Sequence, residues 1–168
     1  MATKTIQFTL DVSSIAQAIQ EVEKYRDDLK HAIQELVRTL TEEGREAAIM
    51  NVVRLGAFDT GQLADTSFHT RGYYSDDYSI GIIYTDAYYA VFVEYGTGVV
   101  GKAGPKHPFL PAGWEHDHNH HGDAGWTYIS DRDGKLHWTK GQPSRPFMYQ
   151  TYMELIRMAQ QKFSNLQI

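Results

Sequence analysis

The most constraining feature of the sequence is a long run of apolar residues at helical spacing in its first third. Asp11, Ser13 and Ser14 are favourable N-cap residues, and charged side chains fill the positions between the apolar ones. The pattern predicts one long helix, or two in sequence if Gly44 interrupts it, preceded by a short strand at 6–10. We expect the stripe to pack on the chain's own sheet; the alternative is a subunit interface. The stripe consists of Ile15, Ile19, Val22, Leu29, Ile33, Leu36, Val37 and Leu40, and resumes at Ala47, Met50, Val53 and Leu55.

A β-rich segment follows the helix. Residues 67–74 and 78–84 are strand candidates on either side of a polar turn at 75–77, which predicts a hairpin. The apolar run 89–94 predicts a third strand, which stops at the Gly-Thr-Gly turn of residues 96–98. The expected fold class is α+β, with the long helix packed on a small, mainly antiparallel meander.

The segment 99–141 is predicted to be a long loop insert. It holds six of the eight histidines, and its aromatic content argues against disorder. A loop of this length inside a compact domain is normally functional or disordered. The pair Asp133-Gly134 predicts a hairpin between 126–129 and 136–138. Tryptophan is a favoured interface anchor, so the candidate contact residues are Trp114, Trp126 and Trp138.

The length fits a single domain covering residues 1–168. Its expected parts are an N-terminal strand and long helix at 1–55, a sheet core at 67–98, the insert at 99–141 and a C-terminal helix at 146–165.

Composition excludes some classes of function. The net charge of −5 argues against specific nucleic-acid binding, although an acidic surface can line a passage for DNA without binding it. The chain has no cysteine, so a disulfide framework or thiolate metal site is excluded. Neither a signal-peptide pattern nor a stretch of membrane-span length occurs, and no membrane partner is expected.

The strongest candidate for chemistry is a histidine cluster in the insert. Alternating imidazoles can converge on zinc, nickel or copper. The spacing resembles the His-x-His-x-Asp-His signature of metallo-β-lactamase-like hydrolases, except that a histidine stands where the second acid belongs. We expect a solvated loop, and a metal-dependent hydrolase is the alternative function. The metal-ligand candidates are His116, His118, His120 and His121.

Other motifs are interpreted as structural. Segment 59–61 is expected to cap and turn the chain so that Leu63 enters the core. Glu94 is expected to accept hydrogen bonds from turn amides or to pair with Arg145. The sequence has no P-loop, nucleophile-elbow or zincin-helix motif, so these common enzyme sites are absent.

In this order, the segments resemble the family of small tail-component proteins of long-tailed bacteriophages and prophages, described as tail-completion, neck or minor capsid proteins. The resemblance covers roughly residues 14–165 and is carried by the long helix and by 59–63, 89–98 and 142–148. The insert is similar to that of members from phages of Gram-positive bacteria. The residues carried over as fold determinants are Gly61, Glu94, Gly96, Gly98, Arg145 and Pro146.

The resemblance implies a structural virion role at the head–tail junction or the top of the tail. The resemblance implies homo-oligomeric rings, often six-fold, that dock on the connector, tail terminator or tail tube. It implies a location in the virion, and in the host cytoplasm during assembly. It brings no catalytic residue and no cofactor, so no enzymatic activity is expected. We expect the segments at 94–98 and 145–147 to hold the two ends of the insert together at the sheet edge.

Overall fold

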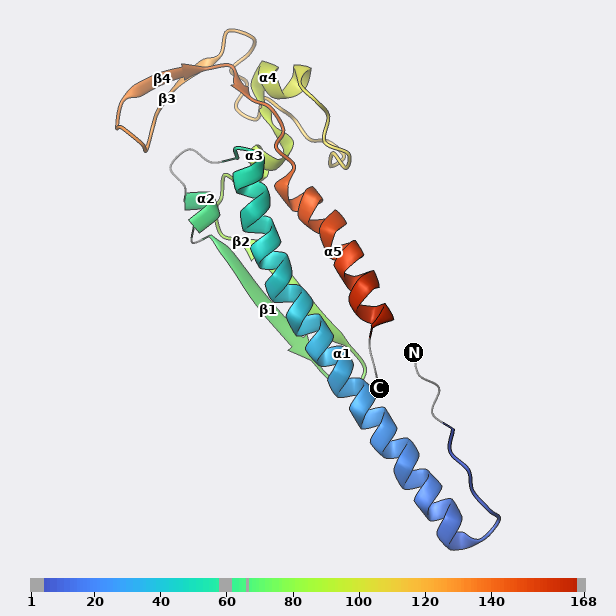
Figure 1. Ribbon diagram of the computed structural model, residues 1–168. Helices are drawn as coiled ribbons and strands as arrows, with labels where there is room; N and C mark the ends of the chain where they lie inside the picture. The colour runs from blue at the N-terminus through green and yellow to red at the C-terminus, as the bar shows by residue number, and fades with distance from the viewer. Residues whose placement is uncertain (1–4, 58–61, 66, 166–168) are drawn as a thin grey trace.

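The fold is built around one helix, α1 (Val12–Arg54), which is 43 residues long. The computed structural model in Figure 1 describes residues 5–57, 62–65 and 67–165, without the side chain of residue 65. Asp11 caps the helix by accepting a hydrogen bond from the Ser14 amide at 2.9 Å. Of the two predicted alternatives, one long helix is the observed one, and Gly44 does not interrupt it. A β-carbon there would lie 2.5 Å from Ile83 and 2.8 Å from Leu155, so glycine allows α1 to approach both neighbours closely.

Two elements pack on α1. Strands β1 (Phe68–Tyr74) and β2 (Ser79–Thr85) form an antiparallel hairpin along one side, preceded by the short helix α2 (Gln62–Asp65). The C-terminal helix α5 (Phe147–Ser164) runs along another side (Figure 1). These elements confirm the predicted α+β class, the hairpin and the final helix.

The core lies where α1, the hairpin and the start of α5 meet. Phe147 is fully buried and its ring contacts Phe68 edge to face, with centroids 5.9 Å apart. Beside it, the buried amide of Asn51 donates to Thr151 Oγ1 at 3.1 Å, which joins α1 to α5. The buried cluster is Ala48, Val52, Ala57, Leu63, Phe68, Ala90, Val93 and Phe147.

The prediction for segment 59–63 is confirmed in part. Leu63 enters the core as expected and is only 1% exposed. Asp59, Thr60 and Gly61, which were expected to cap and turn the chain, lie outside the described residues.

Two predicted strands do not form. The run 89–94 is instead the helix α3 (Ala90–Tyr95), whose buried residues Ala90, Val93 and Glu94 follow helical spacing. A short apolar run does not distinguish a strand from one helical turn, which explains the error. Residues 6–10 have no regular structure, because no neighbouring strand in the described chain pairs with them. The predicted meander is therefore replaced by two separate two-stranded sheets.

Only the second half of α1 is buried. All its buried residues lie between Thr41 and Val52. Closer to the N-terminus, the stripe that was predicted to pack on the chain's own sheet is exposed, with Ile19 at 54% and Val22 at 55%. The predicted packing is thus correct for the second half of the helix and wrong for the first.

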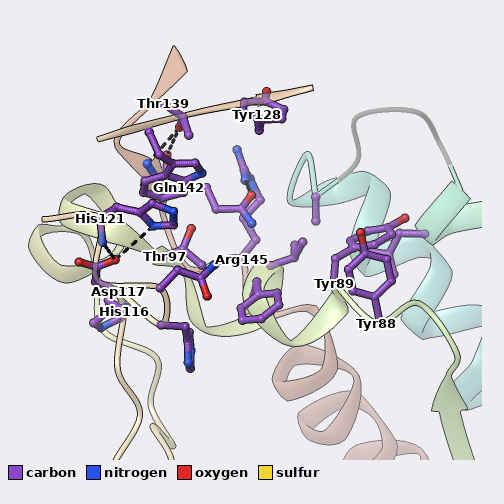
Figure 2. Close-up of a pocket in the computed structure, with 18 of the residues that line it drawn as sticks. Tyr88, Tyr89, Thr97, His116, Asp117, His121, Tyr128, Thr139, Gln142 and Arg145 are labelled. Carbon is purple, nitrogen blue, oxygen red and sulfur yellow. Dashed lines mark hydrogen bonds and ion pairs between the residues drawn. The ribbon is translucent and has the colours of Figure 1, made fainter. Parts of the chain in front are cut away.

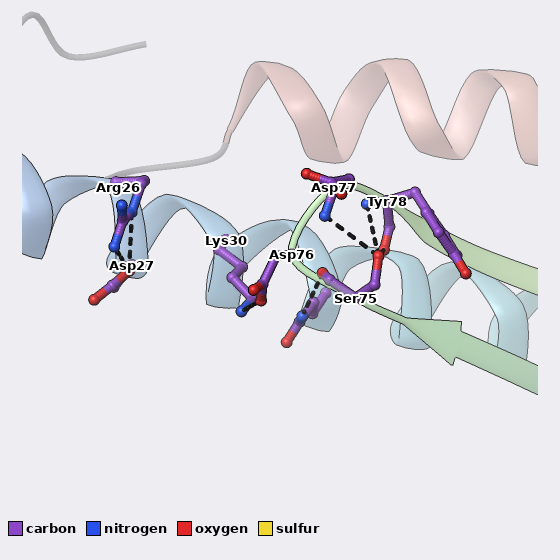
Figure 3. A network of polar contacts seen from close by, with 8 residues as sticks. Arg26, Asp27, Lys30, Ser75, Asp76, Asp77 and Tyr78 are labelled. Carbon is purple, nitrogen blue, oxygen red and sulfur yellow. Dashed lines mark hydrogen bonds and ion pairs between the residues drawn. The ribbon is translucent and has the colours of Figure 1, made fainter.

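The boundary between the two halves is the turn of the β1–β2 hairpin. Lys30 pairs with Asp76 there, and Gln34 Nε2 donates to the Ser75 carbonyl at 3.4 Å (Figure 3). The part of α1 before Lys30 extends past this turn (Figure 1). Within the described ranges, no helix combines the length and the apolar character needed to cross a membrane.

Replacing Phe147 with alanine is expected to lower the free energy of unfolding by about 3–5 kcal/mol, because it empties a fully buried site. The control is Phe163→Ala on the same helix, where the side chain is 48% exposed. Urea denaturation measures both variants. Equal losses would contradict the placement of the core at the start of α5.

Candidate functional site

The two ends of the insert are joined by backbone pairing. Thr97 pairs with Gln142 and Gly98 with Gly141, both in antiparallel bridges. We call this pairing of 96–98 with 141–145 the clasp. It joins the start of helix α4 (Gly98–Ala103) to the short strand β5 (Gly141–Gln142). The prediction that these motifs hold the insert together is confirmed, but the clasp lies at the end of α3 and not at a sheet edge.

Further hydrogen bonds fix the clasp to α3. The Arg145 amide donates to the Val93 carbonyl at 2.9 Å, and Ser144 Oγ donates to the Glu94 carbonyl at 2.6 Å. The residues just before α5 are therefore attached to the last turn of α3.

Glycine is required where the two chains of the clasp cross. Gly98 has φ +62° and Gly141 has φ +98°, a region that side chains rarely adopt. A β-carbon on Gly98 would lie 2.2 Å from the Lys140 carbonyl oxygen, and one on Gly141 would lie 1.9 Å from that of Thr97. The backbones can approach this closely only because both positions are glycine.

Glu94 lies beneath the clasp and caps α5. Its Oε2 accepts from the Met148 amide at 2.9 Å, and its Oε1 accepts from the Tyr149 amide at 3.0 Å. The N-cap position itself is Pro146, which has no side-chain acceptor, so a carboxylate from α3 satisfies the free amides of α5. The predicted pairing with Arg145 is wrong. The prediction of amide donors is right, although they belong to α5 and not to the turn.

His107 completes the surroundings of Glu94. Its Nδ1 accepts from the Phe109 amide at 2.9 Å, which places the ring proton on Nε2, and Nε2 donates to Glu94 Oε1 at 2.8 Å. Both side chains are almost fully buried, at 3% and 7% exposure. His107 was not among the residues predicted from the sequence. The contact joins positions 13 apart, and no spacing rule indicates such a pair.

Arg145 lines a cavity of about 670 Å³ between α3, the insert and the second hairpin (Figure 2). Its Nη1 donates to Gln142 Oε1 at 3.2 Å, and in the part of the chain that the structure describes no carboxylate pairs with it. Aromatic side chains from α3 and the insert, including Phe92 and Trp126, form much of the wall.

The four histidines of the predicted cluster do not converge, and His116 binds to the clasp. Its Nδ1 lies 3.2 Å from the Gly96 carbonyl oxygen, and its own carbonyl accepts from the Gly98 amide at 2.6 Å. A histidine in the middle of the insert thus holds the Gly-Thr-Gly turn in place.

The remaining three histidines diverge. His118 packs edge to face on Trp114 with ring centroids 4.5 Å apart, and His121 stacks on Trp126 at the same distance. His120 is exposed, with φ +54°. Among the described residues, no three histidine or acidic side chains are grouped so that they could hold a metal ion. The metal-dependent hydrolase gains no support from these contacts.

Asp117 organises the turn that carries these histidines. Its carboxylate accepts from the amides of Gly122 and His121, both at 2.8 Å, and these bonds hold the pKa of Asp117 below its usual range. Because the pKa is lower in the folded chain than in the unfolded one, this contribution to stability is present at neutral pH. It is lost as the pH falls through the folded pKa.

The second hairpin, β3 (Trp126–Ile129) with β4 (Leu136–Thr139), confirms the predicted hairpin of the insert. Paired residues share a face, so Trp126 and Thr139 both line the cavity. The alternate positions carry Ile129, Leu136 and Trp138, which are 68%, 73% and 60% exposed, and Ile129 also borders the cavity. We call these three side chains the hairpin face.

Comparison with known proteins found no counterpart. No protein-family model, no curated protein and no solved structure matches this chain. Its function therefore has to be argued from its own residues.

The three tryptophans predicted as contact residues differ in their surroundings. Trp114 and Trp126 are half-buried within the insert, where Trp114 also packs on Tyr95 with centroids 4.9 Å apart. Trp138 is exposed, and Lys140 Nζ lies over its ring, 5.7 Å from the centroid. Two of the three thus pack within the insert, and the third is exposed to solvent.

Glu94→Gln is expected to lower the free energy of unfolding by about 1–3 kcal/mol, because an amide offers one acceptor oxygen where three donors converge. The matched control is Glu46→Gln at an exposed position of α1. Urea denaturation compares the two. Equal stability of the two variants would show that Glu94 does not cap α5.

Gly98→Ala is expected to destabilise the chain more than Gly113→Ala. Both glycines have positive φ, so each alanine costs about 1–2 kcal/mol, but nothing lies within 4 Å of a β-carbon at Gly113. The added clash with Lys140 at Gly98 should open the clasp and speed hydrogen exchange of the Val100 amide, which donates to that carbonyl. Equal stability and unchanged exchange would contradict the tight crossing.

Proposed function

We propose that this chain is a structural virion protein of a long-tailed phage, located at the head–tail junction or the top of the tail. It acts by assembling into a homo-oligomeric ring and docking on neighbouring neck or tail proteins. The phage assignment is supported by the succession of motifs along the sequence, from the long helix to the Arg-Pro-Phe motif. The exposed apolar surface of the fold supports the mode of action.

The observation that carries the proposal is the presence of exposed apolar side chains at both ends of the molecule. The β3–β4 hairpin, which carries the hairpin face, lies at one end, and the projecting start of α1 lies at the other (Figure 1). Soluble monomers rarely expose such contiguous patches, and larger ones mark sites of protein–protein contact. A protein that joins other proteins needs surfaces of this kind.

The buried and turn-forming polar side chains near the insert support a structural role, because their hydrogen bonds hold the chain in place. Glu94, His107 and Asp117 all form hydrogen bonds to backbone amides or to each other, and so position the chain. The hairpin face is held out on a short two-stranded sheet that the clasp ties to α3. Two strands alone are marginally stable, so a neighbouring protein that covers this face would also stabilise it.

The charge of the chain fits a position beside DNA without a specific site. A net charge of −5 lets DNA pass along a ring without adhering to it. In this proposal the protein assembles in the host cytoplasm and remains in the finished particle.

Deleting the gene is expected to leave DNA-filled heads and tails unjoined, or tails of faulty length, as seen by electron microscopy. A plasmid copy should restore infectious particles. A copy carrying Ile129→Asp and Leu136→Asp should fail, because both charges fall on the hairpin face. Tyr152→Asp, an exposed position on α5, is the control and should restore them. Normal infectious particles from the deletion would overturn the proposal.

A further inference from the structure

The β1–β2 hairpin has an apolar face that points away from α1. In its register, Tyr73 lies opposite Ile80 and Arg71 opposite Ile82, and these pairs share one side of the sheet. Gly81 and Ile83 lie on the other side, against α1 and the core. We call the open side the outer face. Its large apolar members are Tyr73, Ile80, Ile82 and Tyr84, which are 45%, 47%, 40% and 38% exposed.

The projecting start of α1 carries a second unpartnered surface. Four apolar side chains lie three and four residues apart, which places them along one side of the helix. We call them the N-terminal stripe. They are Val12, Ile15, Ile19 and Val22, which are 87%, 38%, 54% and 55% exposed.

The two surfaces complement each other in shape and size. A helix packed on the apolar side of a sheet is the arrangement that buries both, and the hairpin already has it on its inner side. The N-terminal stripe extends over about 15 Å at 1.5 Å per residue. The seven-residue strands extend over about 23 Å. The stripe therefore fits within the length of the outer face.

The stripe does not reach the outer face of its own chain. Helix α1 packs on the inner side of the hairpin, and the stripe lies beyond the hairpin turn at Lys30 and Asp76 (Figures 1 and 3). A helix that covers the outer face must come from another molecule. A second copy of this chain carries a helix of the required length and apolar pattern.

Charge complementarity favours the same pairing. Arg71 lies in the middle of the outer face, where its Nη1 contacts the Tyr73 hydroxyl at 3.4 Å. Across the described ranges, no carboxylate pairs with Arg71. Glu23 follows Val22 at the edge of the stripe and also has no ion pair among the described residues. Opposite charges at such positions fix the register of a contact.

We infer that the N-terminal stripe of one copy packs on the outer face of the next copy, with Glu23 directed at Arg71. Two different surfaces meet, so the contact is head-to-tail and repeats from copy to copy until a ring closes. The inference rests on the proposed function, which requires a ring, and assigns the surfaces that form it.

Disulfide crosslinking tests this contact directly, because the natural chain has no cysteine. The full chain is prepared as two single variants, Ile19→Cys and Ile82→Cys, which are mixed and oxidised. The expected result is a disulfide between positions 19 and 82 of different molecules, identified by the mass of the linked peptides. Phe163→Cys, at an exposed position of α5, replaces Ile19→Cys in the control and should give no linkage to position 82.

Charge reversal provides a second measurement. Glu23→Arg and Arg71→Glu should each reduce the association constant by roughly tenfold or more, measured by sedimentation. The double variant should recover most of the loss, as expected for a pair of charges that face each other. Both positions are exposed, so unchanged thermal unfolding of each variant shows that folding is intact.

Three results would overturn the inference. Linkage of position 19 only to position 19 would show two stripes packed on each other. Oligomers that persist in Ile19→Asp and Ile82→Asp would place the ring contact elsewhere and leave the virion role standing. A chain that stays monomeric at every concentration would leave these faces to a different protein. In contrast, linkage of 19 to 82 together with normal particles from the gene deletion would overturn the proposed function alone.

Discussion

The arrangement of this molecule depends on one buried carboxylate. Glu94 accepts hydrogen bonds from His107 and from the amides of Met148 and Tyr149, so three parts of the chain meet at one side chain. Without it, α5 would begin at a proline with no side-chain cap, and the insert would lose the hydrogen bond by which His107 helps to hold it at the end of α3. A buried charge is tolerated only when hydrogen bonds replace its lost water, and here three donors do so.

The clasp above Glu94 allows the insert to be long without loosening the core. Its two ends cross at Gly98 and Gly141, which closes the insert into a loop, and His107 and Trp114 attach that loop to the end of α3. The entropic cost of closing a loop grows slowly with its length. The insert can therefore present the hairpin face without any change in the packing of α1, α5 and the first hairpin.

The sequence predicts those elements whose signals are local. Each of these signals depends only on neighbouring residues. They are the cap at Asp11, the helical spacing of the apolar stripe and the turn at Asp133-Gly134, and the corresponding elements form. The failures come from information that a single segment does not contain. The run 89–94 is too short to show its period, and the partners of Glu94 lie 13, 54 and 55 positions away. The apolar stripe of α1 indicates that this side of the helix is covered, but it does not indicate whether the same chain or a second protein covers it.

The central claim is that this chain works as a component of a particle, by contact with its neighbours. Quantitative mass spectrometry of purified, DNA-filled virions tests that claim most directly. The account predicts that peptides of this chain are present at a fixed number of copies per particle, in a whole-number ratio to the portal. Absence of the chain from infectious particles that were produced in cells expressing it would contradict the account.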